Sequence, residues 1–425
     1  MNWPLLQNSL LLAGTTTALA LGFGVVTALW LATLEARRRN AFLALAVAAL
    51  ALPPFLVTNC WIRLLGDNGL LRAWLPFGIY SLGGTIWILS LQLWPISLLA
   101  GLAGWRRLEV AQFECEPALT GFALLRWLLL PVARGELALA AVVTFVLALN
   151  NFAVPAILQT KVLPDEMWVR FNTQFDALGA LRLSLPLVLA PVLLLAWLSR
   201  RAVPWPRIQG AVPARVVRRQ LGSAWRLGAG TLAALLLALS LGLPLAQIAL
   251  EKRTWTELAG AVAAGTGAIW NSLWYASLAA TVVVLVALTI STVHRQRRDA
   301  ARRHCNQVGA RTFLSTSAGH LTVAGKHVRA PGESSQDATA LGDGAAENSE
   351  RRGALRNLPA PEPPRLSASS ASLRSSFAWL PFFVPGVLIG IALIKLFNRP
   401  GLAGFYQSAG IVVLALALRY AAVGW

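Results

Sequence analysis

The side chains best suited to acid–base chemistry or metal binding gather in one polar segment, residues 293–376. All four histidines of the chain lie there, with one of its three cysteines: His294, His304, His320, His327 and Cys305. Imidazole and thiolate are ligands that zinc prefers, but the spacing matches no standard zinc pattern. No motif for nucleophilic or metal-assisted hydrolysis occurs elsewhere. Metal binding stays a minor alternative, and the sequence predicts neither a metal site nor a catalytic centre.

A nucleotide-binding loop is also missing from the sequence, because no GxxxxGK[ST] pattern occurs. The glycine pairs Gly22/Gly24 and Gly265/Gly267 lack a third glycine and lie inside apolar runs. They are predicted to be packing positions. We therefore expect no bound cofactor, and any ATP that drives this protein must be bound by a separate subunit.

Four polar side chains stand out because they lie inside long apolar runs: Asn59, Arg63, Asn150 and Asn151. Polar groups at membrane depth cost free energy and are candidates for function. The asparagine pair is predicted either to form hydrogen bonds between helices or to line a translocation path. Arg63 is predicted either to reach the outer membrane interface or to contact a substrate.

The composition places these residues in a membrane protein. The chain has 425 residues, of which 56% are hydrophobic and 13% charged, and its mean hydropathy is +0.60. A soluble domain is about 45–50% apolar and about 25% charged. The net charge of +19 fits arginine-rich cytoplasmic loops better than nucleic-acid binding, so no nucleic-acid partner is expected. The sequence predicts an all-α, polytopic helical membrane protein.

Nine apolar stretches are candidates for spanning helices, since a span needs about 20 apolar residues. They cover residues 9–33, 41–65, 82–102, 137–159, 180–199, 227–249, 269–292, 377–397 and 406–424. The second is interrupted by Pro53-Pro54. Arginine clusters follow the first, third, fifth and seventh spans: 37–39, 106–107, 200–226 and 295–303. Such loops are cytoplasmic, so the N-terminus is predicted to be outside and Trp425 inside.

The chain shows a parallel internal repeat. Asn8-Ser9-Leu10 is echoed by Asn271-Ser272-Leu273, and Leu52–Phe55 by Leu380–Phe383. The second copy stops at Trp425, so we expect a truncated second repeat. Duplicated spans in one chain are common in transporters.

The predicted organisation follows from these boundaries. It comprises a first repeat with spans one to five (1–200), a basic cytoplasmic linker (201–226), spans six and seven (227–292), a polar insert expected to be disordered (293–376) and spans eight and nine (377–425).

The long loop at 103–136 carries both signs of charge and ends in Leu130-Pro131. It is predicted either to fold as short helices that lie against the membrane face or to be an ordinary amphipathic connector. With this loop, the two-half layout resembles the inner-membrane permease subunit of a binding-protein-dependent ABC importer. The similarity is greatest to fused permeases of the ferric-iron, thiamine and polyamine type. In that family such a loop carries the pattern EAA, then Gly, then Leu-Pro, and docks into the ATPase. Here the EAA positions fall on residues 112–114, so the motif is degenerate.

The resemblance implies a type I permease fold of about nine spans with an incomplete second repeat. The implied ATPase-coupling residues are Glu114, Glu116, Ala118, Gly121, Arg126, Leu130 and Pro131. The implied partners are an ABC ATPase, a periplasmic substrate-binding protein, the lipid bilayer and a possible second copy of the chain. The implied location is the bacterial inner membrane, with a periplasmic N-terminus and a cytoplasmic C-terminus.

The function that follows from the resemblance is uptake of a small solute, with ferric iron favoured. Two alternatives stay open. One is a secondary transporter driven by an ion gradient, which would normally place ionisable residues inside its spans. The other is a truncated permease without activity.

Overall fold

The computed structural model describes residues 3–73, 78–106, 108, 113, 119–174, 176–199, 214–324 and 380–424. Within these ranges every regular element is helical. Up to residue 199, the helices are α1 (Trp3–Ala32), α2 (Ala36–Ala51), α3 (Pro54–Leu65), α4 (Leu82–Trp105), α6 (Gly121–Leu124), the π-helical turn η1 (Leu125–Leu129), α7 (Leu130–Leu149), α8 (Ala153–Ile157), α9 (Leu163–Asn172) and α10 (Ala177–Ser199). From residue 214 onward, the helices are α11 (Ala214–Leu221), α12 (Ser223–Leu237), the π-helical turn η2 (Ala238–Gly242), α13 (Leu243–Leu250), α14 (Lys252–Ala324), α17 (Leu380–Phe383), α18 (Gly386–Phe397), α19 (Ala403–Tyr406) and α20 (Ala409–Gly424).

Five helical stretches are long and apolar enough to cross a membrane, and a bent sixth joins them if its two halves count as one span. The five are Trp3–Ala32, Leu82–Trp105, Gly121–Ile157, Ser223–Leu250 and Lys252–Val293. Three further predicted spans coincide with shorter apolar helices, Gly179–Leu194, Gly386–Phe397 and Ala409–Ala421. The predicted class, an all-helical polytopic membrane protein, is confirmed.

The bent span is the predicted stretch 41–65, which is two helices rather than one. α2 and α3 meet at an angle of 87°. Pro53 and Pro54 have no backbone N–H, so they cannot continue the hydrogen bonds of α2. The second half breaks in the same way: Pro385 precedes α18 with an extended backbone, as Pro53 precedes α3. This break lies at Pro385, beyond the Leu380–Phe383 pairing expected from the sequence.

Both π-helical turns precede a Leu-Pro pair. Leu130 donates its N–H to the Leu125 carbonyl, and Leu243 donates to that of Ala238. A proline within a helix cannot donate and crowds the carbonyl one turn earlier. A widened turn accommodates this crowding, as π-bulges in long helices do. Leu130-Pro131 therefore lies inside a continuous helix.

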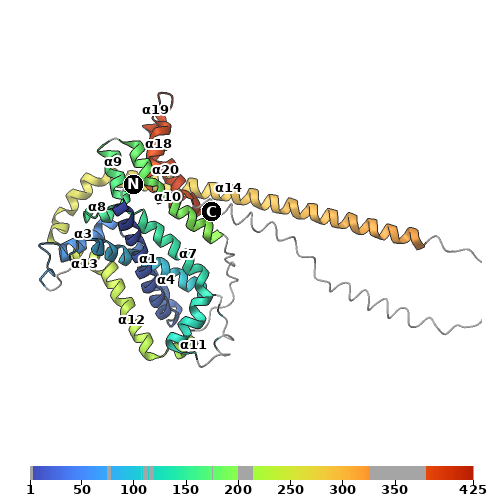
Figure 1. Cartoon of the computed structure of the whole chain (residues 1–425), viewed down its shortest axis with the longest axis horizontal. Coiled ribbons are helices and arrows are strands. Elements are labelled where there is room, and N and C mark those ends of the chain that lie inside the picture. Colours follow the sequence, from blue (N-terminus) through green and yellow to red (C-terminus); the bar gives the residue numbers. More distant parts are fainter. Residues whose placement is uncertain are drawn as a thin grey trace, which may run out of the picture. The chain divides into compact units, whose positions relative to one another are not determined.

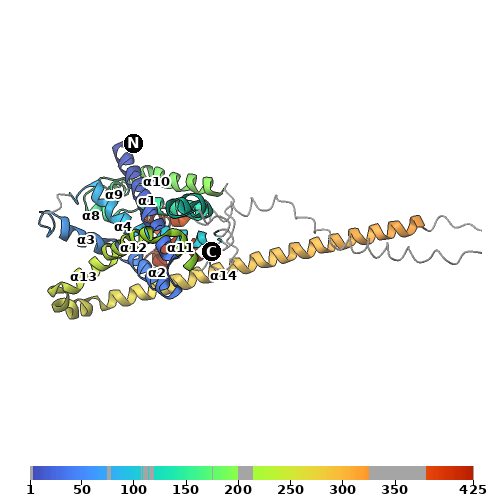
Figure 2. The same cartoon turned by 90° about the horizontal axis from the view of Figure 1, so that it is seen from below.

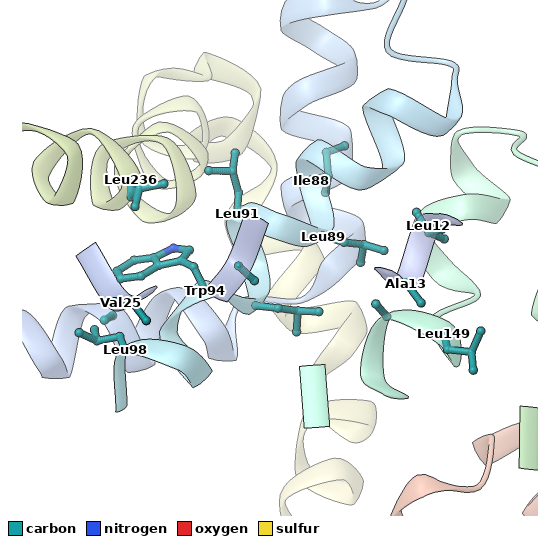
Figure 3. Packing of buried hydrophobic residues seen from close by; sticks show 14 of the residues in the cluster. Leu12, Ala13, Val25, Ile88, Leu89, Leu91, Trp94, Leu98, Leu149 and Leu236 are labelled. Carbon is teal, nitrogen blue, oxygen red and sulfur yellow. The ribbon is translucent and has the colours of Figure 1, made fainter. Parts of the chain in front are cut away.

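The core of the bundle forms where α4 packs against α1 and α7 (Figure 1). α1 and α4 also lie close together in the view from below (Figure 2). Trp94 of α4 is fully buried and lies near Val25 of α1 and Leu236 of α12 (Figure 3). Gly24 allows α1 to pack this close to the backbone of α4, because a β-carbon at position 24 would lie 2.7 Å from the Trp94 carbonyl oxygen.

Two expectations about loops differ from the structure. The expected loop 103–136 is helical from Gly121 onward and runs into the next span. The segment 293–376 was expected to be disordered, but α14 continues to Ala324. Many polar residues in this part of the sequence have good helix propensity. A composition that cannot bury a core does not by itself prevent a helix. The rest of that segment lies outside the described residues. The chain divides into two units, residues 1–283 with 375–424, and residues 284–374 with Trp425.

Candidate translocation path and coupling face

Two broken helices meet inside the bundle. α3 follows the break at Pro53, α8 follows a break after Asn150, and α3 packs against α8. α4 packs against both. Discontinuous helices at membrane depth are tolerated where they are buried in protein or line a water-filled cavity, and in transporters they form solute sites. The region between the two breaks is therefore the candidate translocation path.

Gln92 of α4 supports the first break. Its side-chain amide nitrogen donates to the Leu52 carbonyl at 3.2 Å, and the residue is only 7% exposed. Leu52 follows the last residue of α2, and the Leu56 N–H that would continue the helix donates to the Pro53 carbonyl instead. Gln92 therefore provides a partner for a carbonyl at the helix end that has no helical donor. Among the described residues, the other amide atom, Oε1, has no hydrogen-bond partner. Gln92 was not among the residues predicted from the sequence, although an amide inside an apolar helix is a signal for such a role.

Asn150 and Asn151 lie at the second break, as their position in the apolar run suggested. The side-chain oxygen of Asn151 accepts from the Val154 N–H at 3.1 Å. Asn151 lies just before the N-cap residue Phe152, and this capping bond satisfies one of the N–H groups that the first turn of α8 leaves unpaired. Asn150 is half-buried and follows the last residue of α7. The capping role was not one of the two roles predicted for this pair.

The end of α8 is tied to α4 by two hydroxyl groups. Thr85 and Thr160 are within hydrogen-bond distance at 3.1 Å, and the Thr160 N–H donates to the Pro155 carbonyl at 2.9 Å. Gln159, just before, adopts a positive φ of 56°. Both threonine side chains are buried. This bonded turn fixes how α8 enters the bundle.

The segment after α8 is fastened to the start of α1. Ser9 accepts from the Leu163 N–H at 2.9 Å, and Asn8 donates to the Lys161 carbonyl at 3.2 Å. In α9, Trp168 stacks on Phe152 at the second break, with ring centroids 5.9 Å apart. An aromatic ring of α9 thus packs beside the break.

Asn59 and Arg63 share the exposed face of α3, one helical turn apart. Arg63 forms an ion pair with Glu251, which lies between α13 and α14. Both members are accessible, with side chains 54% and 31% exposed. The ion pair joins the two halves of the chain, a contact that the sequence could not reveal.

A second group of residues surrounds the start of the helix that contains α6, η1 and α7. Gly121 opens α6 with a φ of +54°, and a β-carbon there would lie 2.8 Å from the Trp225 ring nitrogen of α12. Phe122 stacks on Trp225, with centroids 6.2 Å apart. Glycine at position 121 therefore allows both the turn and the close aromatic contact.

The predicted coupling residues Arg126, Leu130 and Pro131 follow on the same helix. The Arg126 guanidinium lies 5.6 Å from the ring centre of Trp127, which is 67% exposed. The buried Trp105 ring nitrogen donates to the Leu129 carbonyl at 2.9 Å. Leu130 and Pro131 thus shape the helix, and Arg126 with Trp127 is accessible to a partner. Glu114, Glu116 and Ala118 lie outside the described residues.

The linker helix α11 joins this group, although the sequence predicted only a basic linker in this segment. Gln220 donates to the Phe113 carbonyl at 2.7 Å, and Arg218 donates to the Thr33 carbonyl at 3.0 Å. Val217 and Leu221 are buried one turn apart. This apolar pair with arginines on the opposite side is an amphipathic signal. We name Phe122, Arg126, Trp127 and Trp225, with α11, the coupling face.

No group of three or more histidine, cysteine or acidic side chains that could hold a metal ion occurs within the described part of the chain.

Comparison with known proteins gives one informative likeness. No family model matches the chain. Over 177 residues it is 28% identical to a protein of Haloferax volcanii described as a probable molybdenum ABC transporter permease. The match covers 40% of this chain and 65% of that relative, so the chain spans less than two thirds of the relative's length. The likeness supports an ABC importer permease at the family level, and it gives no support to the expected ferric-iron type.

Proposed function

We propose that this chain is the membrane-spanning permease subunit of an ABC importer. The observation that carries the proposal is the partial likeness to an ABC transporter permease in a chain whose apolar helices form a bundle. The two broken helices next to α4 support the placement of a solute path inside that bundle. The proposed location is the bacterial inner membrane, with the N-terminus periplasmic.

The free energy for transport would come from ATP hydrolysed on a separate ABC ATPase. The coupling face is the proposed contact with that ATPase, because it combines exposed aromatic rings with a cation and continues directly into α7. α7 ends at the second break, so a displacement of the coupling face reaches the solute path along one helix. A periplasmic binding protein would deliver the solute to the opposite end.

The solute that the residues favour is an oxyanion, with molybdate as the first candidate. The path candidates are amides and a guanidinium: Asn59, Arg63, Gln92, Asn150 and Asn151. These groups supply N–H donors, which suit the oxygens of an anion, whereas ferric iron prefers anionic oxygen ligands. The name of the Haloferax volcanii relative also contains molybdenum, which as a solute in oxygenated water is the molybdate dianion.

Purification from membranes tests the proposal. The tagged chain is isolated in mild detergent and probed for a bound ABC ATPase. In the test variant, Arg126→Glu and Trp127→Ala alter the coupling face without removing any segment of the helix. The control variant carries Arg253→Glu and Trp255→Ala, which are exposed at the start of α14.

The expected result is an ATPase that co-purifies with the unaltered chain and the control, and is reduced at least about tenfold with the test variant. Equal recovery with the test variant would show that the coupling face is assigned wrongly. Well-inserted chain that recovers no ATPase would contradict the importer proposal and favour a permease-like protein without transport activity.

A further inference from the structure

The exposed face of α3 carries polar side chains that need an aqueous or protein environment. Phe55, Asn59 and Arg63 are each one turn apart on this face, and all three are exposed. α3 is the second half of a candidate span. An exposed amide and guanidinium in such a segment are rarely left against lipid, and they usually face a cavity or a partner group. We therefore expect this face to meet water or a partner group and not lipid.

Arg63 already holds an anion in this structure. The anion is the carboxylate of Glu251, the residue that separates α13 from α14. Arg63 lies in the last turn of α3, where the helix dipole favours a cation. A guanidinium has five N–H donors, and one carboxylate uses at most two of them well. Donors remain for a second anion, and the amide of Asn59 lies one turn away.

The ion pair is also exposed enough to exchange. Half of the Arg63 side chain and about a third of the Glu251 side chain are accessible. Exposed ion pairs contribute little free energy, so a solute anion does not have to overcome a strong internal bond. A dianion interacts about twice as strongly as a carboxylate with the same cation at equal distance.

We propose that Asn59 and Arg63 form an entry site for a tetrahedral oxyanion dianion, and that Glu251 occupies the guanidinium until this anion displaces it. The proposal rests on the proposed function for the class of solute. Because Glu251 lies at the turn between α13 and α14, its release also removes one of the contacts that hold this turn against α3. Arrival of the anion is thereby linked to the contact between the two halves.

Binding of radiolabelled molybdate to the full chain in nanodiscs of uncharged lipid tests this inference. Equilibrium dialysis measures the dissociation constant without an ATPase or a binding protein. Arg63→Gln removes the cation, Asn59→Ala removes the amide, and Glu251→Gln removes the competing carboxylate. Arg253→Gln is the matched control, since Arg253 is exposed close to Glu251 and pairs with Glu257 instead. The melting temperature without molybdate shows that each variant is folded.

The expected pattern has two opposite signs. Arg63→Gln weakens binding at least about tenfold, because a charge-assisted bond is lost. Glu251→Gln strengthens binding about two- to fivefold, the value of an exposed ion pair. Asn59→Ala weakens binding, and Arg253→Gln leaves it unchanged. Sulfate competes with molybdate, and chloride at equal ionic strength does not.

Three results would overturn the inference: binding that survives Arg63→Gln, binding that weakens with Glu251→Gln, or displacement by chloride as effective as by sulfate. None of these depends on an ATPase. A chain that binds molybdate as expected but recovers no ATPase would contradict the proposed function and leave the anion site in place. A chain that recovers the ATPase but does not show this binding pattern would contradict the anion site and leave the proposed function in place.

Discussion

Gly24 lies where α1 packs against α4, and replacing it by alanine should separate the two helices. The added β-carbon would lie 2.5 Å from the Ser97 β-carbon and 2.6 Å from the Leu98 backbone nitrogen. Because backbone atoms cannot rotate away, the helices themselves must shift. Gly22 lies two residues earlier on the same helix, and a β-carbon there would meet nothing within 4 Å. Gly22→Ala is therefore the matched control.

The magnitude follows from comparing the two variants. Within a helix, alanine is more favourable than glycine by about 0.5–1 kcal/mol, and both variants receive this gain. Only Gly24→Ala also overpacks the core, which costs about 1–3 kcal/mol. The gain cancels in the comparison, so Gly24→Ala should be about 1–3 kcal/mol less stable than Gly22→Ala.

Unfolding in mixed detergent micelles, followed by circular dichroism, measures this difference. The expected order of stability is Gly22→Ala, then the unaltered chain, then Gly24→Ala. If the free energies of unfolding of the two variants differ by less than about 0.5 kcal/mol, the close packing of α1 against α4 is wrong, because the cost of overpacking a core is larger than that.

Two further predictions concern single polar groups. Gln92→Leu leaves the Leu52 carbonyl without its donor but also removes the unpartnered Oε1, so we expect a net loss of about 1 kcal/mol in the same unfolding assay; an unchanged stability would mean that the bond contributes nothing. Burial, and then the charge of Glu166, raise the pKa of the Asp165 carboxyl. The folded chain therefore favours the protonated carboxyl. Its contribution to the stability of the folded chain is fully present below the ordinary pKa of aspartate, and it is lost as the pH rises through the raised pKa of the folded chain. Asp165→Asn should therefore stabilise the chain at neutral pH but not at acidic pH, and a gain independent of pH would contradict this origin.

Local features of the sequence predicted the helical elements well. Apolar runs located the helices that could cross a membrane, because hydrophobic length is a local property. Pro53-Pro54 predicted a break in the second span, because a missing N–H acts on the preceding turn. The same reasoning did not predict that residues 121–136 belong to the helix of the fourth span, since their charge and length suggested a loop. It also failed at residues 293–324, where polarity excluded a core without excluding a helix.

The candidate site was predicted only in part. Asn59, Arg63, Asn150 and Asn151 were found from their polarity within apolar runs, which the sequence displays directly. Gln92 carried the same signal and was missed. The two predicted repeats and the orientation in the membrane remain predictions.

Only the tertiary structure decided which groups meet. Gln92 reaches Leu52 because α4 crosses the bend between α2 and α3. Arg63 meets Glu251 because α13 packs against α3. Hydrophobic length and proline act over one helical turn, so one sequence window contains them. Partners far apart in the chain are chosen by helix packing, and that choice depends on all the side chains of the bundle together.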